Sequence, residues 1–429
     1  MAPSPPLPSR SPAAALQAIA RKVNIITLKT VREVAAENGV DEDEVPASHP
    51  DVAACVYSGT MIKEQLTTDA AWDGVLTHQQ VVFARTTPQQ KLAIVENYQR
   101  LGNVVAVTGD GTNDSPALKR ADCGVAMAIS GSSVSKAAGD ILLMDDNINS
   151  LIAAIEEGRV LFDNLKKSIA YTLAHLWPEL LPVFLNIALT MPLGLPGLII
   201  LTIDLFTEQI PAISFSYEVA EGSVMERPPR NPKSDRLVNR SLLIYAYCVA
   251  GAAEALTAMF AYLMVYQMAG IQASCLLNTA STFWANPPSI GSATFFNSGA
   301  TYVGPQCGPP LSPDGQVALY QQSVSAWYLT IVLCQAGHVW VCKTRLNSIF
   351  DHPMFRNYMT AVGVVVAVLI AAFCIYTPGV QTFFYTGPLA GQIWPCALVF
   401  WAFILAYTEI VKYCTRKHPT CFAAKYLAW

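Results

Sequence analysis

Apolar and polar residues are distributed differently in two parts of the chain. Up to about residue 165, short apolar runs alternate with charged segments of helical pattern, and beyond it the chain contains long apolar stretches. Strands that alternate with helices are typical of a parallel, doubly wound sheet. The pattern therefore predicts an α/β domain over 17–165, followed by an all-α membrane domain over 166–429.

Four short apolar runs are the predicted strands of the α/β domain. A helix predicted over Pro88–Leu101 separates the first two, because Pro favours the first position of a helix. Each run is bounded by Gly, Asp or other polar residues. The four runs are Val81–Ala84, Val104–Val107, Val125–Ala128 and Ile141–Met144.

Two segments of the N-terminal region are predicted to lack regular structure. Residues 1–16 are rich in Pro, Ser and Ala and have no continuous apolar core of the kind found in a secretory signal, so we expect them to be disordered. A transit peptide is the less favoured alternative, since the segment has poor helical amphipathicity. The acidic run 41–44 is expected to be a solvated loop rather than a metal site.

Six apolar stretches are of the length that crosses a bilayer, about 20 residues each. They lie near 168–190, 196–216, 241–267, 324–342, 358–377 and 391–411. The connecting segments fall into two classes of charge. Arg or Lys occurs in 218–240, 343–357 and 412–429, and neither occurs in 191–195, 268–323 and 378–390. The positive-inside rule then predicts that both termini are cytoplasmic.

The composition supports a membrane protein. Hydrophobic residues make up 52% of the chain and charged residues 14%, which departs strongly from the averages for soluble proteins. The net charge is -4 and no basic stripe is present, so no nucleic-acid partner is predicted. The 11 cysteines show no CxxC or Cys/His metal spacing. Cys275 and Cys307 share one predicted non-cytoplasmic loop, where a disulfide between them is an open possibility.

The segment Thr108–Lys119 carries the candidate chemistry of the α/β domain. It follows a predicted strand and places two carboxylates and an amide where open α/β sheets bind phosphates and metals. Asp110 is the candidate Mg²⁺ ligand, because Mg²⁺ is bound through one or two carboxylates plus phosphate oxygens. Asn113 and Asp114 would hold the loop and the phosphoryl oxygens through hydrogen bonds.

Other residues complete this candidate phosphate site. Thr108, Gly109 and Gly111 belong to the loop, and the two glycines let its backbone approach a phosphate closely. Lys91 lies on the first turn of the helix that starts at Pro88, from which its charge could reach a phosphoryl group. The alternative is purely structural, with Asp110–Gly111 as a turn and Asn113 as a helix cap.

Twelve consecutive residues of Thr108–Lys119 resemble the hinge motif of P-type cation-transporting ATPases, with Thr112 where valine is usual. The sequence is most similar to the α-subunits of the sodium/potassium and gastric proton/potassium pumps. The similarity continues in Asp122–Met127, Asp145–Asn147, Glu156–Leu173, Ser214–Lys233 and Cys342–Arg345. It implies part of a HAD-like phosphorylation domain, followed by the last six spans of a pump of the plasma membrane.

The resemblance also implies an ATP-driven exchange of Na⁺, K⁺ or H⁺ that requires Mg²⁺. Complete members of the family carry an actuator domain, four earlier spans, a nucleotide-binding domain and a phosphorylated aspartate in a DKTGT motif. Neither DKTG nor TGES occurs in this sequence. Phosphoryl transfer through an aspartyl phosphate needs that aspartate as the nucleophile. The chain alone is therefore not expected to bind ATP productively or to autophosphorylate.

Acidic residues within the first two predicted spans indicate an ion pathway. Tyr171, His175 and Glu179 are four residues apart and share one helical face, and Asp204 and Glu208 are again four apart. Intramembrane carboxylates are costly, and they mark ion pathways that face the interior of a bundle. The alternative, in which the acids reach an interface, does not suit their positions in the middle of the spans.

Two prolines lie next to these acids. Pro178 precedes Glu179 and Pro211 follows Glu208. A proline inside a helix cannot donate a backbone hydrogen bond, so a carbonyl one turn earlier is left free. Freed carbonyls are suitable cation ligands in membrane helices.

By resemblance, Glu179, Asp204 and Glu208 match positions that bind the transported cations, and Gln335 in the fourth span is retained. Other positions depart from the sodium/potassium pump. Ala174 replaces a Thr and Leu176 an Asn ligand, His338 stands where an Asp is expected, and Val366 and Ala367 replace an acidic pair. The third sodium site of that pump is therefore predicted to be absent.

His175 replaces the Ser of the sodium/potassium pump and the Lys of the gastric pump. We hypothesise that it acts as an internal titratable cation, which would favour proton or electroneutral exchange. The alternative is a buried neutral histidine.

Three interpretations of the whole chain remain. The first is a fragment or shortened form of a P-type pump α-subunit. The second is a non-catalytic membrane protein that regulates a full pump and holds a β-like partner through the loop 268–323. The third, a phosphatase-like enzyme fused to spans, is disfavoured because the nucleophile is missing.

Overall fold

The computed structural model describes residues 12–22, 25–40, 45, 51–222, 224–230, 235–277, 279, 311–418, 420–427 and 429. They form two compact units, Met1–Ala154 and Ile155–Trp429, each described by itself below. The acidic run 41–44, Cys307 and most of the predicted disordered segment lie outside the described residues. Helix α1 (Pro12–Lys22) includes the last residues of that segment, where Ala and Leu are good helix formers.

The strands of the first unit pair in parallel, as the alternating pattern predicts. Strand β1 (Ala54–Ser58) pairs with β2 (Gln80–Ala84), and β3 (Ala106–Gly109), β4 (Cys123–Met127) and β5 (Ile141–Leu143) follow each other in a second sheet. Among the described residues, β2 and β3 share no ladder, so the strands form two small sheets rather than one. The sequence analysis missed β1, whose apolar run Cys55–Tyr57 is interrupted by no charge.

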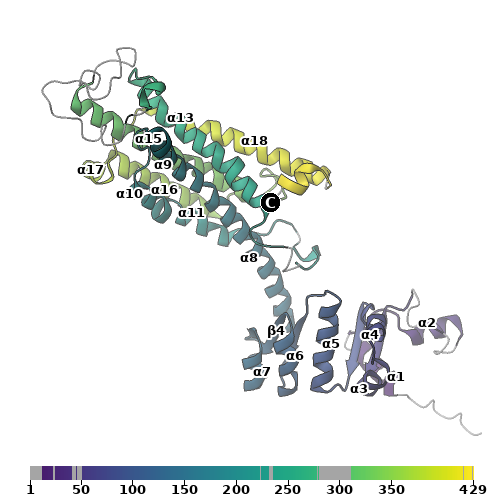
Figure 1. Ribbon diagram of the computed structural model, residues 1–429. Helices are drawn as coiled ribbons and strands as arrows, with labels where there is room; N and C mark the ends of the chain where they lie inside the picture. The colour runs from purple at the N-terminus through teal and green to yellow at the C-terminus, as the bar shows by residue number, and fades with distance from the viewer. Residues whose placement is uncertain are drawn as a thin grey trace, which may run out of the picture. The chain divides into compact units, whose positions relative to one another are not determined.

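Short helices cover these strands (Figure 1). Trp72, Ile62 and Val75 pack with the half-buried Phe83 of β2 into a core between the helices and the two-stranded sheet. The helices are α2 (Val31–Asn38), α3 (Gly59–Gln65), α4 (Asp69–Leu76), α5 (Pro88–Arg100), α6 (Ser115–Arg120) and α7 (Ser133–Ala138).

Helix α5 begins where the sequence predicts, because Thr87 and Gln90 form a capping box. The backbone N–H of Thr87 donates to Oε1 of Gln90 at 2.9 Å, and Oγ1 of Thr87 accepts from the backbone N–H of Gln90 at 3.3 Å. Nε2 of Gln90 also donates to the carbonyl of Gly59 at 2.7 Å, which ties the helix to the end of β1. These bonds fix the first turn, from which Lys91 projects.

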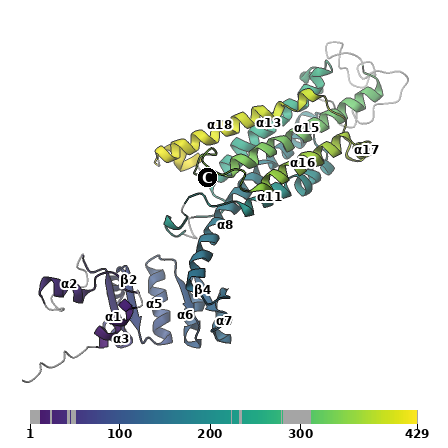
Figure 2. The same ribbon diagram turned by 180° about the vertical axis from the view of Figure 1, so that it is seen from behind.

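The second unit is helical. Among the described residues, six helical segments are long and apolar enough to cross a membrane, which confirms the six predicted spans: Ile148–Leu189, Gly197–Tyr217, Arg240–Met268, Asp314–Cys342, Tyr358–Tyr376 and Gly391–Lys417. Figure 2 shows the helices from behind. Their elements are α8 (Ile148–Ala174), α9 (Leu176–Leu189), α10 (Gly197–Thr202), η3 (Ile203–Thr207), α11 (Gln209–Ser214), η4 (Phe215–Tyr217), α12 (Arg240–Leu243), η6 (Ile244–Gly251), α13 (Ala252–Met268), α15 (Pro313–Cys342), α16 (Tyr358–Tyr376), η9 (Gly391–Ile393) and α18 (Cys396–Lys417).

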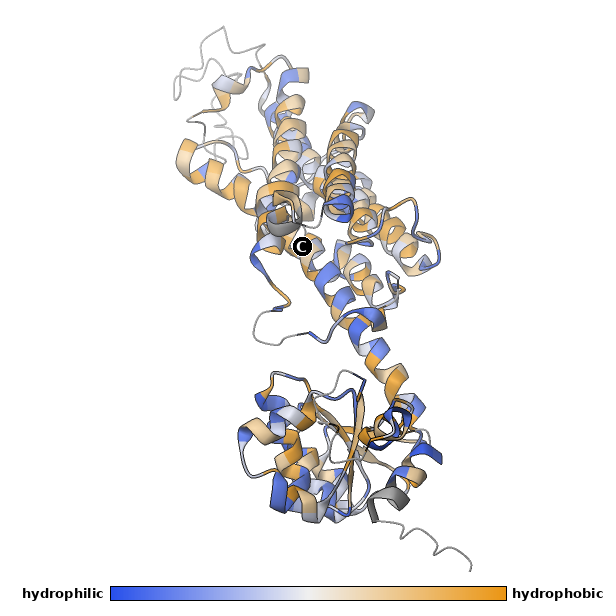
Figure 3. Cartoon of the chain, turned by 90° about the vertical axis from the view of Figure 1, so that its right-hand side faces the viewer, coloured by the Kyte–Doolittle hydropathy of each residue, from blue (hydrophilic) through white to orange (hydrophobic). Residues whose placement is uncertain are grey.

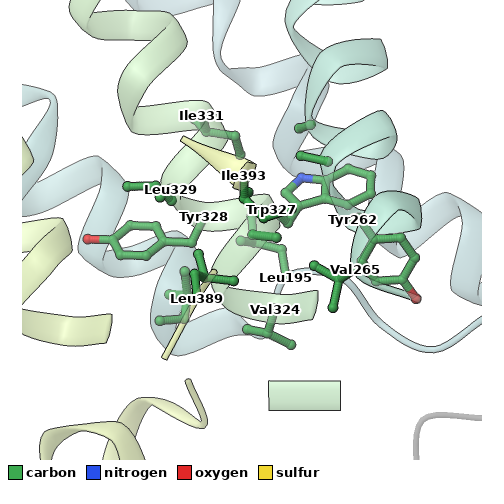
Figure 4. Packing of buried hydrophobic residues seen from close by; sticks show 14 of the residues in the cluster. Leu195, Tyr262, Val265, Val324, Trp327, Tyr328, Leu329, Ile331, Leu389 and Ile393 are labelled. Carbon is green, nitrogen blue, oxygen red and sulfur yellow. The ribbon is translucent and has the colours of Figure 1, made fainter. Parts of the chain in front are cut away.

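Helix α15 lies at the centre of the second unit. Within an apolar stretch of 18 residues in this span, 83% is buried, a larger share than in any other span described. Its Trp327 packs edge-on against Tyr262 of α13, with ring centroids 5.4 Å apart, beside Leu195 (Figure 4). Large apolar side chains such as Leu369 and Val399 face outward on the other helices. Hydrophobic colour predominates on these long helices in Figure 3. An apolar exterior around a packed centre is the arrangement expected in lipid.

A buried ion pair holds the segment that follows η4. Glu221 Oε1 lies 2.8 Å from Lys167 Nζ, and both side chains are almost fully buried. Glu221 Oε2 accepts from the backbone N–H groups of Arg345 at 2.8 Å and Leu346 at 2.9 Å. Burial alone would raise the pKa of Glu221, but the Lys167 charge and these hydrogen bonds hold it below its usual value. The pair therefore joins α8 to the segment after α15.

Candidate functional site

The predicted phosphate loop follows β3 directly. Asp114, on the short 3-10 helix η2 (Thr112–Asp114), accepts from the backbone N–H of Gly111 at 3.3 Å through Oδ2, and its Oδ1 pairs with Nζ of Lys91. A Cβ on Gly109 would lie only 2.6 Å from Cβ of Asp114, so this close approach requires glycine. Two segments far apart in sequence thus meet at one turn, with Lys91 beside the loop.

Asp110 has its backbone and its side chain in different environments. Its carbonyl accepts from the backbone N–H of Ser132 and from Oγ of Ser135, both at 2.8 Å. Its exposed carboxylate forms no hydrogen bond or ion pair with the described residues. Thr108 and Asn113 are also exposed. The hydrogen bonds to the backbone carbonyl hold the loop in place, while the exposed carboxylate of Asp110 remains available to an external ligand.

Ser132 and Ser135 support this loop, and Asp146 holds the neighbouring segment 129–130; all three were missed as individual residues. Asp146 accepts from the backbone N–H groups of Ile129 at 3.0 Å and Ser130 at 2.6 Å. The hydrogen bond from Ile129 is the main reason that the pKa of Asp146 lies below its usual value. The resemblance to the pump family includes Asp145–Asn147 and so pointed to Asp146. The contact of Asp146 with residues 129–130 joins segments far apart in the sequence, so no local pattern predicts it.

In the second unit, the carboxylates predicted within the membrane lie on two interrupted helices. Helix α8 ends at Ala174 and α9 begins after His175, because Pro178 cannot donate to the carbonyl of Ala174. The second span widens into the π-helix η3, in which the backbone N–H of Glu208 reaches the carbonyl of Ile203 at 3.1 Å. Pro211 likewise cannot donate to the carbonyl of Thr207. Both interruptions lie beside an acid.

These interruptions bring three carboxylates around His175. Nε2 of His175 lies 3.1 Å from Oδ1 of Asp204 and 3.9 Å from Oε2 of Glu179. Nδ1 lies 2.6 Å from Oε2 of Glu208. Only the contact with Asp204 has hydrogen-bond geometry, since Nδ1 and both oxygens of Glu208 have no aligned partner. The structure therefore brings the predicted residues His175, Glu179, Asp204 and Glu208 into one cluster, called the His175 cluster below.

The His175 cluster contains buried atoms without hydrogen-bond partners. His175, Glu179 and Glu208 are each at most 5% exposed, and Oε1 of Glu179 and both oxygens of Glu208 are unsatisfied among the described residues. An unsatisfied buried polar group costs about 1–3 kcal/mol, and more when it is charged. A cation bound between these oxygens would remove that cost.

Two cavities reach the cluster. An open cavity of about 450 Å³ extends along α8 past Ser168 and Thr172 to His175, Asp204 and Glu208. A much smaller one has Tyr171, Glu208 and Gln335 in its wall. The predicted residues Tyr171 and Gln335 therefore lie near Glu208, in the wall of the smaller cavity.

Glu254 of α13 is a candidate that the sequence analysis missed. It is fully buried, its Oε2 accepts from Nε2 of Gln335 at 2.8 Å, and its Oε1 has no hydrogen-bond partner among the described residues. It is the one acidic residue in the predicted span 241–267. The criterion applied to Glu179, a carboxylate inside an apolar span, would have found it.

His338, predicted to replace an acid, lies in a neutral environment. Its Nε2 is 2.9 Å from the hydroxyl of Tyr245 and 3.2 Å from Sγ of Cys342. Its ring also contacts Tyr171, with centroids 5.8 Å apart. Val366 and Ala367, which replace an acidic pair, have no polar side-chain atom. The surroundings of His338 therefore offer few oxygen ligands for a cation.

A family model described as "Cation transporting ATPase, C-terminus" matches residues 192–414. The chain is 40% identical over 405 residues to the sodium/potassium-transporting ATPase subunit alpha-3 of Gallus gallus and 42% identical over 406 residues to subunit alpha-4 of Homo sapiens. Each alignment covers 94% of this chain and 38% of the relative, so the chain spans well under half the length of the curated relatives it matches. The match confirms the resemblance drawn from the hinge motif and the spans, and the chain belongs to the P-type cation-transporting ATPases.

Proposed function

We propose that the chain is the C-terminal part of an ATP-driven pump that exchanges monovalent cations, of the sodium/potassium or proton/potassium type. The observation that carries this proposal is the His175 cluster, where three carboxylates meet in the membrane unit and two of them, Glu179 and Glu208, have unsatisfied buried oxygens among the described residues. The similar proteins are named as sodium/potassium-transporting subunits, which agrees with this class of substrate.

The ligands in the cluster suit an alkali cation. Glu179, Asp204 and Glu208 supply carboxylate oxygens, while the carbonyls of Ala174 and Thr207, freed by Pro178 and Pro211, add neutral oxygens. Further candidate ligands are Tyr171, Gln335 and Glu254.

His175 is proposed to modulate this site as an internal cation. When protonated, its ring places a positive charge 3.1 Å from Asp204 and 2.6 Å from Glu208. That charge competes with a transported cation for the same oxygens, because opposite charges interact strongly at low dielectric. A pump with this residue is expected to favour proton or electroneutral exchange.

The first unit is proposed to be part of a HAD-like phosphorylation domain. Asp110 would hold Mg²⁺, whose charge would offset that of a phosphoryl group. Lys91 adds a positive charge, and its pairing with Asp114 keeps it beside Thr108, Gly109, Gly111 and Asn113. ATP and the phosphorylated aspartate would belong to segments that this sequence does not contain.

We further propose that the pump lies in the plasma membrane with both ends of this chain in the cytoplasm. Cys275, in the loop 268–323, is disulfide-bonded. Disulfides persist in oxidising compartments, which supports a non-cytoplasmic position for that loop. A β-like subunit is the proposed partner of the loop, of which 280–310 lie outside the described residues.

Equilibrium binding of radioactive Rb⁺ to the purified chain in lipid nanodiscs tests the cation site. Wild-type chain is expected to bind Rb⁺ saturably, and Glu208→Gln is expected to weaken binding by at least about tenfold, equivalent to roughly 1.4 kcal/mol. Asp314→Asn, which removes an exposed acid at the start of α15, is the matched control. Equal binding by the Glu208 variant and the control would overturn the assignment.

A second candidate function is a non-catalytic regulator of a full-length pump. An antibody against Thr108–Lys119 distinguishes the two by the size of the native polypeptide in source membranes. A band at the size of the full-length relatives supports the pump, and a band at 46.4 kDa alone supports the regulator.

A further inference from the structure

The His175 cluster contains an imidazole nitrogen in addition to its oxygens, which changes the class of ion that it can bind. Alkali cations and Mg²⁺ prefer oxygen ligands, whereas imidazole and carboxylate together suit Zn²⁺ and similar transition metals. His175 Nε2, Glu179 and Asp204 each offer one atom, and these three atoms all lie within 4.8 Å of one another.

The distances are close to those of a zinc site. With bonds of about 2.0–2.1 Å, two ligands of a tetrahedral zinc lie about 3.3 Å apart. Nε2 of His175 is 3.1 Å from Asp204, close to this spacing, and 3.9 Å from Glu179, so Glu179 must approach by about 0.6 Å for one metal ion to contact all three residues. The open cavity lined by His175 and Asp204 provides an entrance and room for a water in the fourth position.

Glu208 supplies the outer contact that such a histidine usually has. A histidine that binds a metal through one ring nitrogen commonly donates its other N–H to a carboxylate, which fixes the ring. Nδ1 of His175 faces Oε2 of Glu208 at 2.6 Å, on the side opposite to Asp204 and Glu179.

We propose that His175, Glu179 and Asp204 bind a divalent transition metal ion of the Zn²⁺ class, with Glu208 as the orienting carboxylate. Because the metal occupies oxygens assigned to the transported cation, it excludes Rb⁺ or K⁺ from the site. It also displaces the proton of His175, so metal binding and the internal-cation role are mutually exclusive. The inhibitory consequence rests on the proposed function, whereas metal binding itself does not.

Co²⁺ and Zn²⁺ are the probes for the test, applied to the full chain in nanodiscs after alkylation of exposed thiols such as Cys248. The wild type is expected to show the intense visible absorption of tetrahedral Co²⁺ and to retain about one more Zn²⁺ per chain than His175→Ser. Asp204→Asn should lose the same signal. Glu208→Gln, which changes the orienting carboxylate but none of the three proposed metal ligands, should weaken metal binding by roughly 10- to 100-fold.

Two controls identify other sources of metal binding. His418→Ser removes an exposed imidazole and should leave the Co²⁺ signal unchanged. His338→Gln removes the histidine beside Cys342, a second close pair of metal-binding side chains in the spans. A signal that survives in His175→Ser, or that disappears in His338→Gln instead, overturns the proposal.

Rb⁺ binding on the same samples separates this proposal from the proposed function. Zn²⁺ is expected to displace Rb⁺ from the wild type and to have little effect on Rb⁺ bound to His175→Ser. A wild-type chain that binds Rb⁺ but gives no Co²⁺ signal overturns only the metal site. A chain that binds Co²⁺ but never Rb⁺ overturns only the monovalent-cation site.

Discussion

At the scale of single residues, His175 lies at the centre of the proposed cation site. Three carboxylates lie within 4 Å of its ring nitrogens, and the side chains of Glu179 and Glu208 are buried with it. Water cannot screen charges at such positions as it does at a surface. The protonation of one imidazole therefore changes the attraction of the whole cluster for an added cation.

Substitutions of His175 should change Rb⁺ affinity in opposite directions. His175→Ser removes the competing charge and is expected to raise the affinity about tenfold at acidic pH, with less effect at alkaline pH, where the imidazole is neutral. His175→Lys keeps a charge at both pH values and should weaken binding relative to the wild type at alkaline pH, with little change at acidic pH. Rb⁺ titrations of the three proteins at two pH values measure this. Identical pH dependence in the wild type and the Ser variant would contradict the internal-cation role.

Glu221 is a residue whose loss should affect stability rather than transport. In Glu221→Gln, Lys167 remains buried without its partner, and breaking such a pair costs roughly 3–5 kcal/mol. Thermal unfolding of the membrane unit in detergent should therefore shift clearly downward. The exposed Glu226→Gln is the matched control and should change stability by less than about 0.5 kcal/mol.

The lowered pKa of Glu221 also gives the sign of a pH effect. Its stabilising contribution is fully present above the usual value of about 4.3 and is lost as the pH falls through the lower value of the folded protein. Wild-type unfolding temperature should thus fall in acid more steeply than that of Glu221→Gln. Parallel curves for the two proteins would show that the pair is not the source.

At the scale of elements, prolines define where the helices that carry the His175 cluster break. Pro182 removes the donor for the carbonyl of Pro178, and Nε1 of Trp327 donates to that carbonyl at 3.0 Å. The carbonyl of Ala174, freed by Pro178, has no such indole and lies one residue before His175. Pro182 thus frees a carbonyl that contacts Trp327 of α15, whereas Pro178 frees a carbonyl beside the His175 cluster.

Pro178→Ala and Pro182→Ala should separate these two roles. Alanine at 178 restores a donor for the carbonyl of Ala174, so the helix is expected to continue through His175 and Rb⁺ binding to weaken by about tenfold. Alanine at 182 should leave the Rb⁺ affinity nearly unchanged. Binding titrations of both variants provide the comparison, and an equal loss in both would contradict a specific role for the break at His175.

The sequence pattern predicted elements better than their contacts. Strands β2 to β5 and helix α5 follow from local signals, such as the apolar run Val125–Ala128 and the capping residue Thr87. The pairing of Lys91 with Asp114, and that of Glu254 with Gln335, joins segments far apart in the chain. Such pairs depend on how helices pack, which no local periodicity encodes. The second span also widens into the π-helix η3, which the 3.6-residue period of a regular α-helix does not predict.

At the scale of the whole molecule, the charges of the connecting segments predict the orientation in the membrane. Lys343, Arg345 and Arg356 lie in one connection, whereas 378–390 contains no basic residue. Positive segments remain in the cytoplasm. The disulfide at Cys275 supports the same orientation, because disulfides persist in oxidising compartments and Cys275 lies in a loop predicted to be non-cytoplasmic.

Cysteines placed on exposed aromatic positions should report this orientation. In intact cells, a membrane-impermeant maleimide is expected to label Phe383→Cys, while Phe350→Cys is labelled only after permeabilisation. Both phenylalanines are strongly exposed in the described structure, so access to the reagent depends on the side of the membrane. Peptide-resolved mass spectrometry separates these sites from the natural cysteines. The reverse pattern would show that the topology is inverted.

The most direct measurement for the central claim is an anomalous difference map from crystals of the chain in Tl⁺, a heavy congener of K⁺. The account predicts a Tl⁺ peak among the carboxylates of Glu179, Asp204 and Glu208, and its disappearance in Glu208→Gln. Tl⁺ peaks elsewhere in the spans with none in the His175 cluster would contradict the assignment of these residues to the transported cation.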